Sequence, residues 1–195
     1  MTRVRLTLLG CLAVMAASAM AASAASAAEF EETVKAAHNV TGKTQKLTAE
    51  GLEGTKIVVT CTKVKGVATF SKTELTGTPE YEECNIAGKT AKVTVACKIG
   101  TTNTGLVNIG KGEGAKTCFT IETNDKSCKL IIKGEQLSLK EVVYKNNGTS
   151  LITEAKVKGI KFESSTGKAC GFKNEAADGS ASYEGTTETT GINIK

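Results

Sequence analysis

Few residues of this sequence have the types and the spacing that enzyme active sites use. His38 is the only histidine, so a Ser-His-Asp triad would depend on it alone. It lies in a polar stretch near the N-terminus, and no nucleophile elbow accompanies it. We therefore interpret His38 as a solvated surface residue and find no complete set of catalytic groups.

Two kinds of short motif match functional patterns only in part. Ser165-Thr166-Gly167-Lys168 has the S-x-x-K spacing of penicillin-recognising enzymes, but its composition is that of a turn and the accompanying motifs are absent. The Gly-Lys-Thr triplets at 42–44 and 88–90 lack the glycine five residues earlier that a phosphate-binding loop requires. We interpret all three segments as turns.

Carboxylate pairs and tyrosines offer two further possibilities. Glycoside hydrolysis needs two acids across a cleft, and Glu31-Glu32 and Glu82-Glu83 supply acids. Neighbouring residues of a strand point to opposite faces, so we expect these glutamates to be surface charge. Sugar-binding modules stack rings on exposed Trp or Tyr. The absence of Trp weakens that reading, and the three tyrosines leave it open: Tyr81, Tyr144 and Tyr183.

The cysteines indicate disulfides. Six of the seven lie beyond the N-terminal segment: Cys61, Cys84, Cys97, Cys118, Cys128 and Cys170. An even number in an exported chain predicts three bridges, which leaves no thiol nucleophile, and no close Cys or His pair suggests a zinc site. Six cysteines allow 15 pairings. Nearness in the sequence favours Cys84 with Cys97 and Cys118 with Cys128. Cys61 and Cys170 then form a long closure.

Residues 1–28 have the three parts of a cleaved signal peptide. Arg3 and Arg5 precede an apolar stretch, and small residues at 21–28 allow cleavage before Ala28 or before Glu29. The apolar part is too short and too rich in Ala and Ser for the ~20 residues of a membrane span. Residues 8–11 also have the form of a lipobox. Lipid attachment to Cys11 is a minor alternative, because only about five apolar residues precede it.

Composition limits the partners of the mature chain. Removing the first 28 of 195 residues leaves 167, enough for one domain with a hydrophobic core at 29–195. The 25 Lys and Arg fall to 23, all of them Lys, against 20 acidic residues, so the net charge falls from +5 to +3. Without Arg, and with Lys scattered among Glu and Thr, the surface argues against nucleic acid or an anionic membrane as a partner.

Hydrophobic alternation is the main structural signal. Residues 90–99 alternate between apolar and polar side chains, and shorter runs at 57–61, 137–143 and 151–162 repeat the pattern. Asn147-Gly148 between two such runs predicts a hairpin. We expect about ten short strands in an antiparallel β-sandwich or barrel-like sandwich. Residues 29–38 fit either a short helix or an edge strand.

Several strings resemble a group of small secreted proteins from high-GC Gram-positive bacteria. They are Pro79-Glu80-Tyr81-Glu82-Glu83-Cys84, Ala87-Gly88, 93–97, 118–128 with Gln136, and Tyr183-Glu184-Gly185. The resemblance covers most of the mature chain, although this chain is richer in Lys. The group has no assigned activity, so the resemblance carries over no catalytic or binding residue.

These features predict a secreted, non-enzymatic β module that binds or structures a partner outside the cell or at the cell envelope. A cell-wall polymer or a surface protein is the expected target, and no cofactor or metal is expected. The loops at 100–104, 110–116 and 173–180 are the candidate contact regions. Two alternatives remain: an extracellular hydrolase that uses carboxylates, and a protease inhibitor that presents Lys on the segment 117–129. The sequence does not predict the oligomeric state.

Overall fold

The structure, a computed structural model, describes residues 28–34 and 37–195. Of the predicted leader, only Ala28 belongs to the described residues. Cys11 lies outside them. Strands dominate the described chain, which confirms the all-β prediction. The strands are β1 (Phe30–Glu32), β2 (His38–Gly51), β3 (Lys56–Phe70), β4 (Glu74–Gly77), β5 (Glu80–Ile86), β6 (Lys89–Val95), β7 (Ile99–Thr102), β8 (Val107–Ile109), β9 (Thr117–Thr123), β10 (Lys129–Lys133), β11 (Gln136–Leu139), β12 (Val142–Asn147), β13 (Ser150–Ser164), β14 (Ala177–Thr190) and β15 (Ile192–Ile194).

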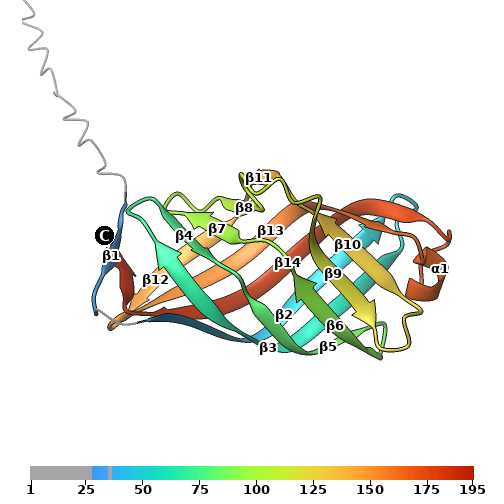
Figure 1. Ribbon diagram of the computed structural model, residues 1–195, viewed down its shortest axis with the longest axis horizontal. Helices are drawn as coiled ribbons and strands as arrows, with labels where there is room; N and C mark the ends of the chain where they lie inside the picture. Colours follow the sequence, from blue (N-terminus) through green and yellow to red (C-terminus); the bar gives the residue numbers. More distant parts are fainter. Residues whose placement is uncertain (1–27, 35–36) are drawn as a thin grey trace, which may run out of the picture.

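Four long antiparallel strands form the continuous wall of the molecule. They lie in the order β3-β2-β14-β13, each with 14 or 15 residues, and run side by side in Figure 1. The described residues form fifteen strands, more than the about ten expected, and these four are long rather than short. Their inward positions alternate with exposed Lys, Glu and Thr, so each strand has one apolar and one wet face.

The sheet closes on itself at one end of these strands. From β13 it continues through β10, β9, β6 and β5, and β5 returns to pair with the 59–65 segment of β3. The result is a closed eight-stranded antiparallel barrel. Closure leaves no unpaired edge in this part of the sheet.

A second set of strands covers the other end. The 68–70 segment of β3 pairs with β4, which leads on to β7, β8 and β11, while β12 pairs with the start of β13. The seam between these two groups is bridged by the Val142 N–H, which donates to the Gly105 carbonyl at 3.1 Å. The Tyr144 hydroxyl donates to the Thr102 carbonyl at 2.7 Å across the same seam.

Bulges allow the long strands to contribute inward-facing residues at both ends of the barrel. The β2–β14 register shifts where Lys43 and Thr44 oppose a single residue, and the β13–β14 register shifts where Lys158 and Gly159 do so. A bulge adds one residue, so the inward positions of the bulged strand change from odd to even or from even to odd. In β13 the buried residues run 151, 153 and 157 before the bulge, and 160, 162 and 164 after it.

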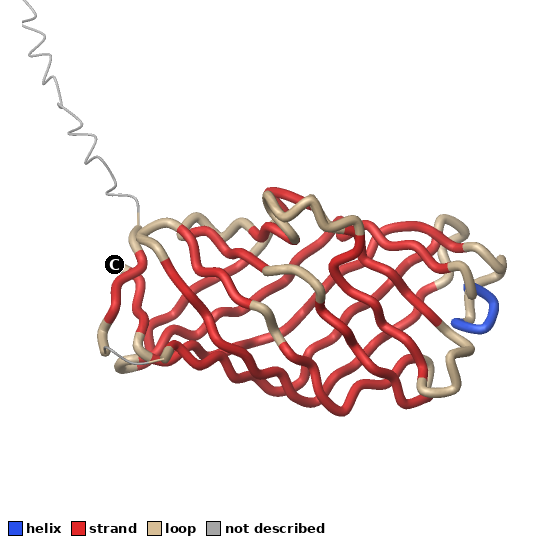
Figure 2. Tube along the Cα trace, viewed as in Figure 1, coloured by secondary structure: helices blue, strands red, loops and turns tan. Residues whose placement is uncertain are grey.

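A short two-stranded sheet and a one-turn helix lie at opposite ends of the barrel. Strands β1 and β15 pair, and Phe30 and Ile192 pack with Leu151 at that end. Of the two options for this N-terminal segment, the structure shows a strand at Phe30–Glu32. Helix α1 (Gly167–Cys170) lies at the other end, as Figure 2 shows.

Three disulfides brace the barrel, but none of the three predicted pairings is correct. The bridges join Cys61 to Cys84, Cys97 to Cys118 and Cys128 to Cys170, with Cα–Cα distances of 4.0, 5.0 and 4.7 Å. Strand register, not distance along the chain, decides which cysteines meet.

The register gives the reason in each case. Cys61 lies directly opposite Cys84 in the β3–β5 ladder. Strand β6 carries the chain away from Cys84, and its last residue, Val95, pairs with Phe119, which brings Cys97 to Cys118. Strand β9 separates Cys118 from Cys128.

Candidate functional site

The interior of the barrel contains a cavity of about 170 Å³. It lies between the main hydrophobic cluster and the smaller cluster beneath β1 and β15, and members of both line it. Most of its wall is formed by the four long strands together with β4, β7, β8 and β12. Tyr81 of β5, Phe119 of β9 and Ile132 of β10 complete the lining. The lining is mostly aliphatic, with Val40, Val64, Leu75, Val107 and Val157 among its members.

Small inward residues leave this space open. Gly66 and Ala68 face the cavity from β3, Ala155 from β13 and Gly185 from β14. An eight-stranded barrel is just wide enough for its side chains to fill or to hold one small ligand. The alanines therefore leave room that larger side chains would fill, whereas a Cβ at Gly66 or Gly185 would meet the Thr78 carbonyl oxygen or the Gln45 side chain.

Two threonine hydroxyls in the cavity wall lack hydrogen-bond partners. Thr153 is only 7% exposed, and its Oγ1 has no partner among the described residues. Thr101, in β7, also lines the cavity; its hydroxyl lies near the Tyr144 phenol but makes no well-formed hydrogen bond within the described chain. A buried hydroxyl without a partner costs about 1–3 kcal/mol.

The Tyr183 phenol in the cavity lining belongs to a network of neutral polar groups. The Tyr183 hydroxyl donates to Gln45 Oε1, while Gln45 Nε2 donates to the carbonyls of Lys43 and Thr186 at 2.9 and 3.1 Å. Burial raises the pKa of the Tyr183 phenol well above its usual value and also raises that of Tyr81. No charged side chain of residues 28–34 and 37–195 lines the cavity, so its interior is apolar and uncharged.

A groove of about 690 Å³ lies outside the same wall. Groove and cavity share Val40, Gly66, Val67 and the 76–78 segment. At this place β3 exchanges β5 for β4 as its neighbour, since Thr78 and Pro79 join those two strands. The residues that line both the groove and the cavity therefore lie where strand pairing changes.

The predicted catalytic candidates have structural surroundings. The interpretation of His38 as a solvated residue is wrong: its side chain is 12% exposed and its ring packs edge-on against Phe70, with centroids 5.1 Å apart. His38 Nε2 lies 3.6 Å from Glu32, and Nδ1 lies 3.2 Å from the Thr190 carbonyl oxygen. These contacts join β2 to β1 and β14.

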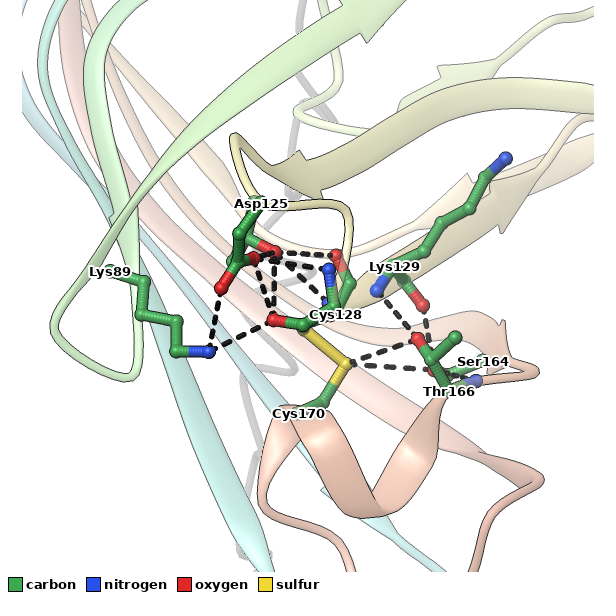
Figure 3. Close-up of a disulfide and its surroundings, with 9 residues drawn as sticks. Lys89, Asp125, Cys128, Lys129, Ser164, Thr166 and Cys170 are labelled. Atoms are coloured by element: carbon green, nitrogen blue, oxygen red, sulfur yellow. Dashed lines mark hydrogen bonds and ion pairs between the residues drawn. A yellow bond between two sulfur atoms is a disulfide. The ribbon is translucent and has the colours of Figure 1, made fainter.

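The S-x-x-K segment braces a disulfide. Ser165 is exposed, and the residues after Thr166 form helix α1 rather than the expected turn. The Lys129 N–H donates to Thr166 Oγ1 at 2.7 Å, and the Ser164 hydroxyl donates to the Lys129 carbonyl at 2.6 Å, beside the Cys128–Cys170 bridge (Figure 3).

The predictions for the Gly-Lys-Thr triplets and for Glu82-Glu83 are confirmed only in part. Gly88 is in the β5–β6 turn as predicted, but Lys89 and Thr90 begin β6, and 42–44 lies within β2 at its bulge. Glu82 and Glu83 carry surface charge, paired with Lys65 and Lys63, but they do not point to opposite faces. Glu83 has a positive φ of 52°, which interrupts the alternation of β5.

The predicted loops are partly strands. Residues 110–116 form a loop, but 100–102 belong to β7 and 177–180 to β14. The segment 117–129 is strand β9 with its hairpin turn, not a projecting inhibitory loop. Sequence reasoning did not find the cavity. The small residues at inward positions were the only signal for it, and they become informative only once the bulges fix which positions face inward.

Comparison with protein-family models, with curated proteins and with solved structures gives no significant match to this chain. Within the described ranges, no cluster of three or more His, Cys, Asp or Glu side chains is placed to hold a metal ion. No helix of the described chain is long and apolar enough to cross a membrane. The cavity is thus the feature on which a functional argument can be built.

Proposed function

We propose that the mature chain is an exported, non-catalytic binding module that holds a small apolar molecule inside its barrel. The observation that carries this proposal is the uncharged, mostly aliphatic cavity of about 170 Å³. A closed apolar cavity of about 150 Å³ stays dry and binds benzene or xenon in other proteins. A molecule of benzene size or slightly larger therefore fits this one.

The export half of the proposal rests on the leader and the cysteines. The 1–28 segment has the three parts of a signal peptide, and all six cysteines of the mature chain are in bridges, as is typical of proteins outside the reducing cytosol. The resemblance to secreted proteins of high-GC Gram-positive bacteria agrees with this location, either released or at the cell envelope.

Binding rather than catalysis is favoured by the lining of the cavity. General acid–base and nucleophilic catalysis require a titratable group near the substrate. Here the ionisable side chains that face the cavity are Tyr81 and Tyr183, and burial keeps both phenols neutral. Such walls bind apolar surface without activating a bond.

Titration of the oxidised mature protein with benzene, followed by two-dimensional NMR, tests the proposal. We expect saturable shifts at residues around the cavity and a benzene-dependent rise in melting temperature. Ala155→Leu adds three carbons inside the cavity and should abolish both effects. Ala169→Leu, at an exposed position of α1, is the matched control and should leave both unchanged.

Absence of saturable binding to the wild type would overturn the proposal. So would unchanged benzene binding by a folded Ala155→Leu variant. If Ala155→Leu does not fold, Ala155→Val fills less of the space and should weaken benzene binding measurably.

A further inference from the structure

We infer that the ligand of the barrel is a neutral, largely hydrocarbon molecule with one hydroxyl or carbonyl group that hydrogen-bonds to Thr153. This inference rests on the proposed function and names the chemical class that the same cavity takes. It depends on the position of the Thr153 side chain, on its missing partner, and on the size and charge of the space in front of it.

The position of Thr153 is fixed by the sheet. It pairs with Tyr144 of β12 on one side and with Thr187 of β14 on the other, in the middle of three hydrogen-bonded strands. Leu151 and Val157, at other inward positions of β13, are buried in the core. Alternation therefore directs the Thr153 side chain into the barrel, where it lines the cavity.

The hydroxyl of Thr153 is unfavourable in the empty barrel. Its Oγ1 is buried and unpartnered within the described chain, whereas valine would have the same shape without a polar atom. Neighbouring positions of the wall do use valine, at Val40, Val64 and Val157. A molecule in the cavity that carries a hydrogen-bonding group removes the penalty and gives the hydroxyl a partner.

A second hydroxyl lies in the same cavity. Thr101 comes from β7, a strand in the part of the wall that follows β4, and its Oγ1 also lacks a partner among the described residues. Thr153 and Thr101 thus place donors in two separate parts of an otherwise aliphatic wall. A carbonyl oxygen can accept from either, and a ligand hydroxyl can donate or accept.

Size and charge narrow the class further. A cavity of about 170 Å³ takes roughly six to ten non-hydrogen atoms, by comparison with benzene in about 150 Å³. With no charged group of the described chain in the lining, a carboxylate or an ammonium would be buried without a counter-charge. The ligand is therefore uncharged and small.

A matched series of six-membered rings tests this inference. Dissociation constants are measured for methylcyclohexane, cyclohexanol, cyclohexanone and cyclohexanecarboxylate at neutral pH. The proteins are the oxidised mature wild type, Thr153→Val and Thr94→Val. Thr94 is exposed on β6 and serves as the control. The informative quantity is the affinity of each oxygenated ring relative to methylcyclohexane in the same protein.

We expect Thr153→Val to weaken cyclohexanol and cyclohexanone binding about five- to tenfold, because one hydrogen bond is lost, and to leave methylcyclohexane equal or tighter. The same variant should melt at the same or a higher temperature without ligand, which separates a ligand contact from a structural role. Thr94→Val should match the wild type, and the carboxylate should bind most weakly.

The possible outcomes distinguish a wrong ligand class from a wrong proposed function. If methylcyclohexane binds but Thr153→Val leaves the relative affinities unchanged, a trapped water satisfies the hydroxyl and the inferred ligand class is wrong. Tight binding of the carboxylate would also overturn the class. If no ring binds to the wild type, the proposed function itself fails.

Discussion

Replacing both Cys61 and Cys84 by alanine tests how much the closure of the barrel depends on its disulfide. The two residues face each other in the β3–β5 ladder, the pairing that completes the eight-stranded ring. Both are buried, at 4% and 3% exposure, so alanine introduces no unpaired polar group. The substitution removes the cross-link and leaves the backbone hydrogen bonds of the ladder in place.

The magnitude follows from the length of chain that the bridge closes. A separation of 23 residues restricts the unfolded chain by about 3.4 kcal/mol in the chain-entropy description. For a chain of this size each kcal/mol lowers the melting temperature by about 2–4 °C, so we expect a fall of about 7–14 °C. The Cys97–Cys118 bridge closes 21 residues and should cost almost the same.

Guanidinium unfolding followed by far-ultraviolet circular dichroism measures the loss. The Cys97→Ala, Cys118→Ala double variant is the matched control. The Cys128→Ala, Cys170→Ala pair, with a separation of 42, should lose about 4 kcal/mol. A loss below about 1 kcal/mol for the Cys61 and Cys84 variant would refute the entropic reasoning. It would show that residual pairing of β3 with β5 already restricts the unfolded chain when the disulfide is absent.

Three further predictions concern titration and processing. Hydrogen bonds from Ser127, Thr123 and Lys89 hold the pKa of the Asp125 carboxyl well below its usual range, so its stabilisation is present at neutral pH and is lost as the pH falls below about 4. Asp125→Asn should therefore lower the urea midpoint at pH 7, and by less at low pH; an equal loss at both would contradict this. Burial raises the pKa of the Tyr144 phenol to about 12, so this tyrosine favours the folded state below pH ~10 and that advantage is lost at higher pH. Little absorbance at 295 nm should appear near pH ~10.5 until the protein unfolds. The intact mass of the exported protein should correspond to a chain starting at Ala28 or Glu29, without lipid, and should rise by the six hydrogens of three bridges on reduction.

Alternation in the sequence predicted the strands but not their lengths. The pattern at 90–99 corresponds to β6 and the chain after it, and Asn147-Gly148 forms the β12–β13 turn as predicted. The pattern breaks near Gly42 and Gly159, which in sequence reads as the end of a strand. In the structure these breaks are bulges, and the chain continues in the same sheet. A period-two argument cannot distinguish a bulge from a turn.

The predicted disulfide pairings were wrong for a related reason. Three bridges follow from an even count of six, but their partners depend on register, which is set between strands far apart in sequence. Cys128 and Cys170 meet only because β13 and β10 pair and place the helix α1 beside the start of β10. Information of this kind lies in the tertiary pairing and not in local spacing.

The low aromatic content acquires a different meaning in the folded chain. In the sequence, an aromatic content of 4% argues against a single dominant hot spot for a protein partner. Inside an eight-stranded barrel, the same scarcity leaves too little volume to fill the interior at positions such as Ala68 and Ala155. An empty space of about 170 Å³ costs about 4 kcal/mol at ~24 cal/mol per Å³. One bridge of 20 to 40 residues contributes a similar amount, about 3–4 kcal/mol. Three bridges therefore allow the barrel to stay hollow and folded, and a molecule that fills the hollow recovers part of that cost as binding affinity.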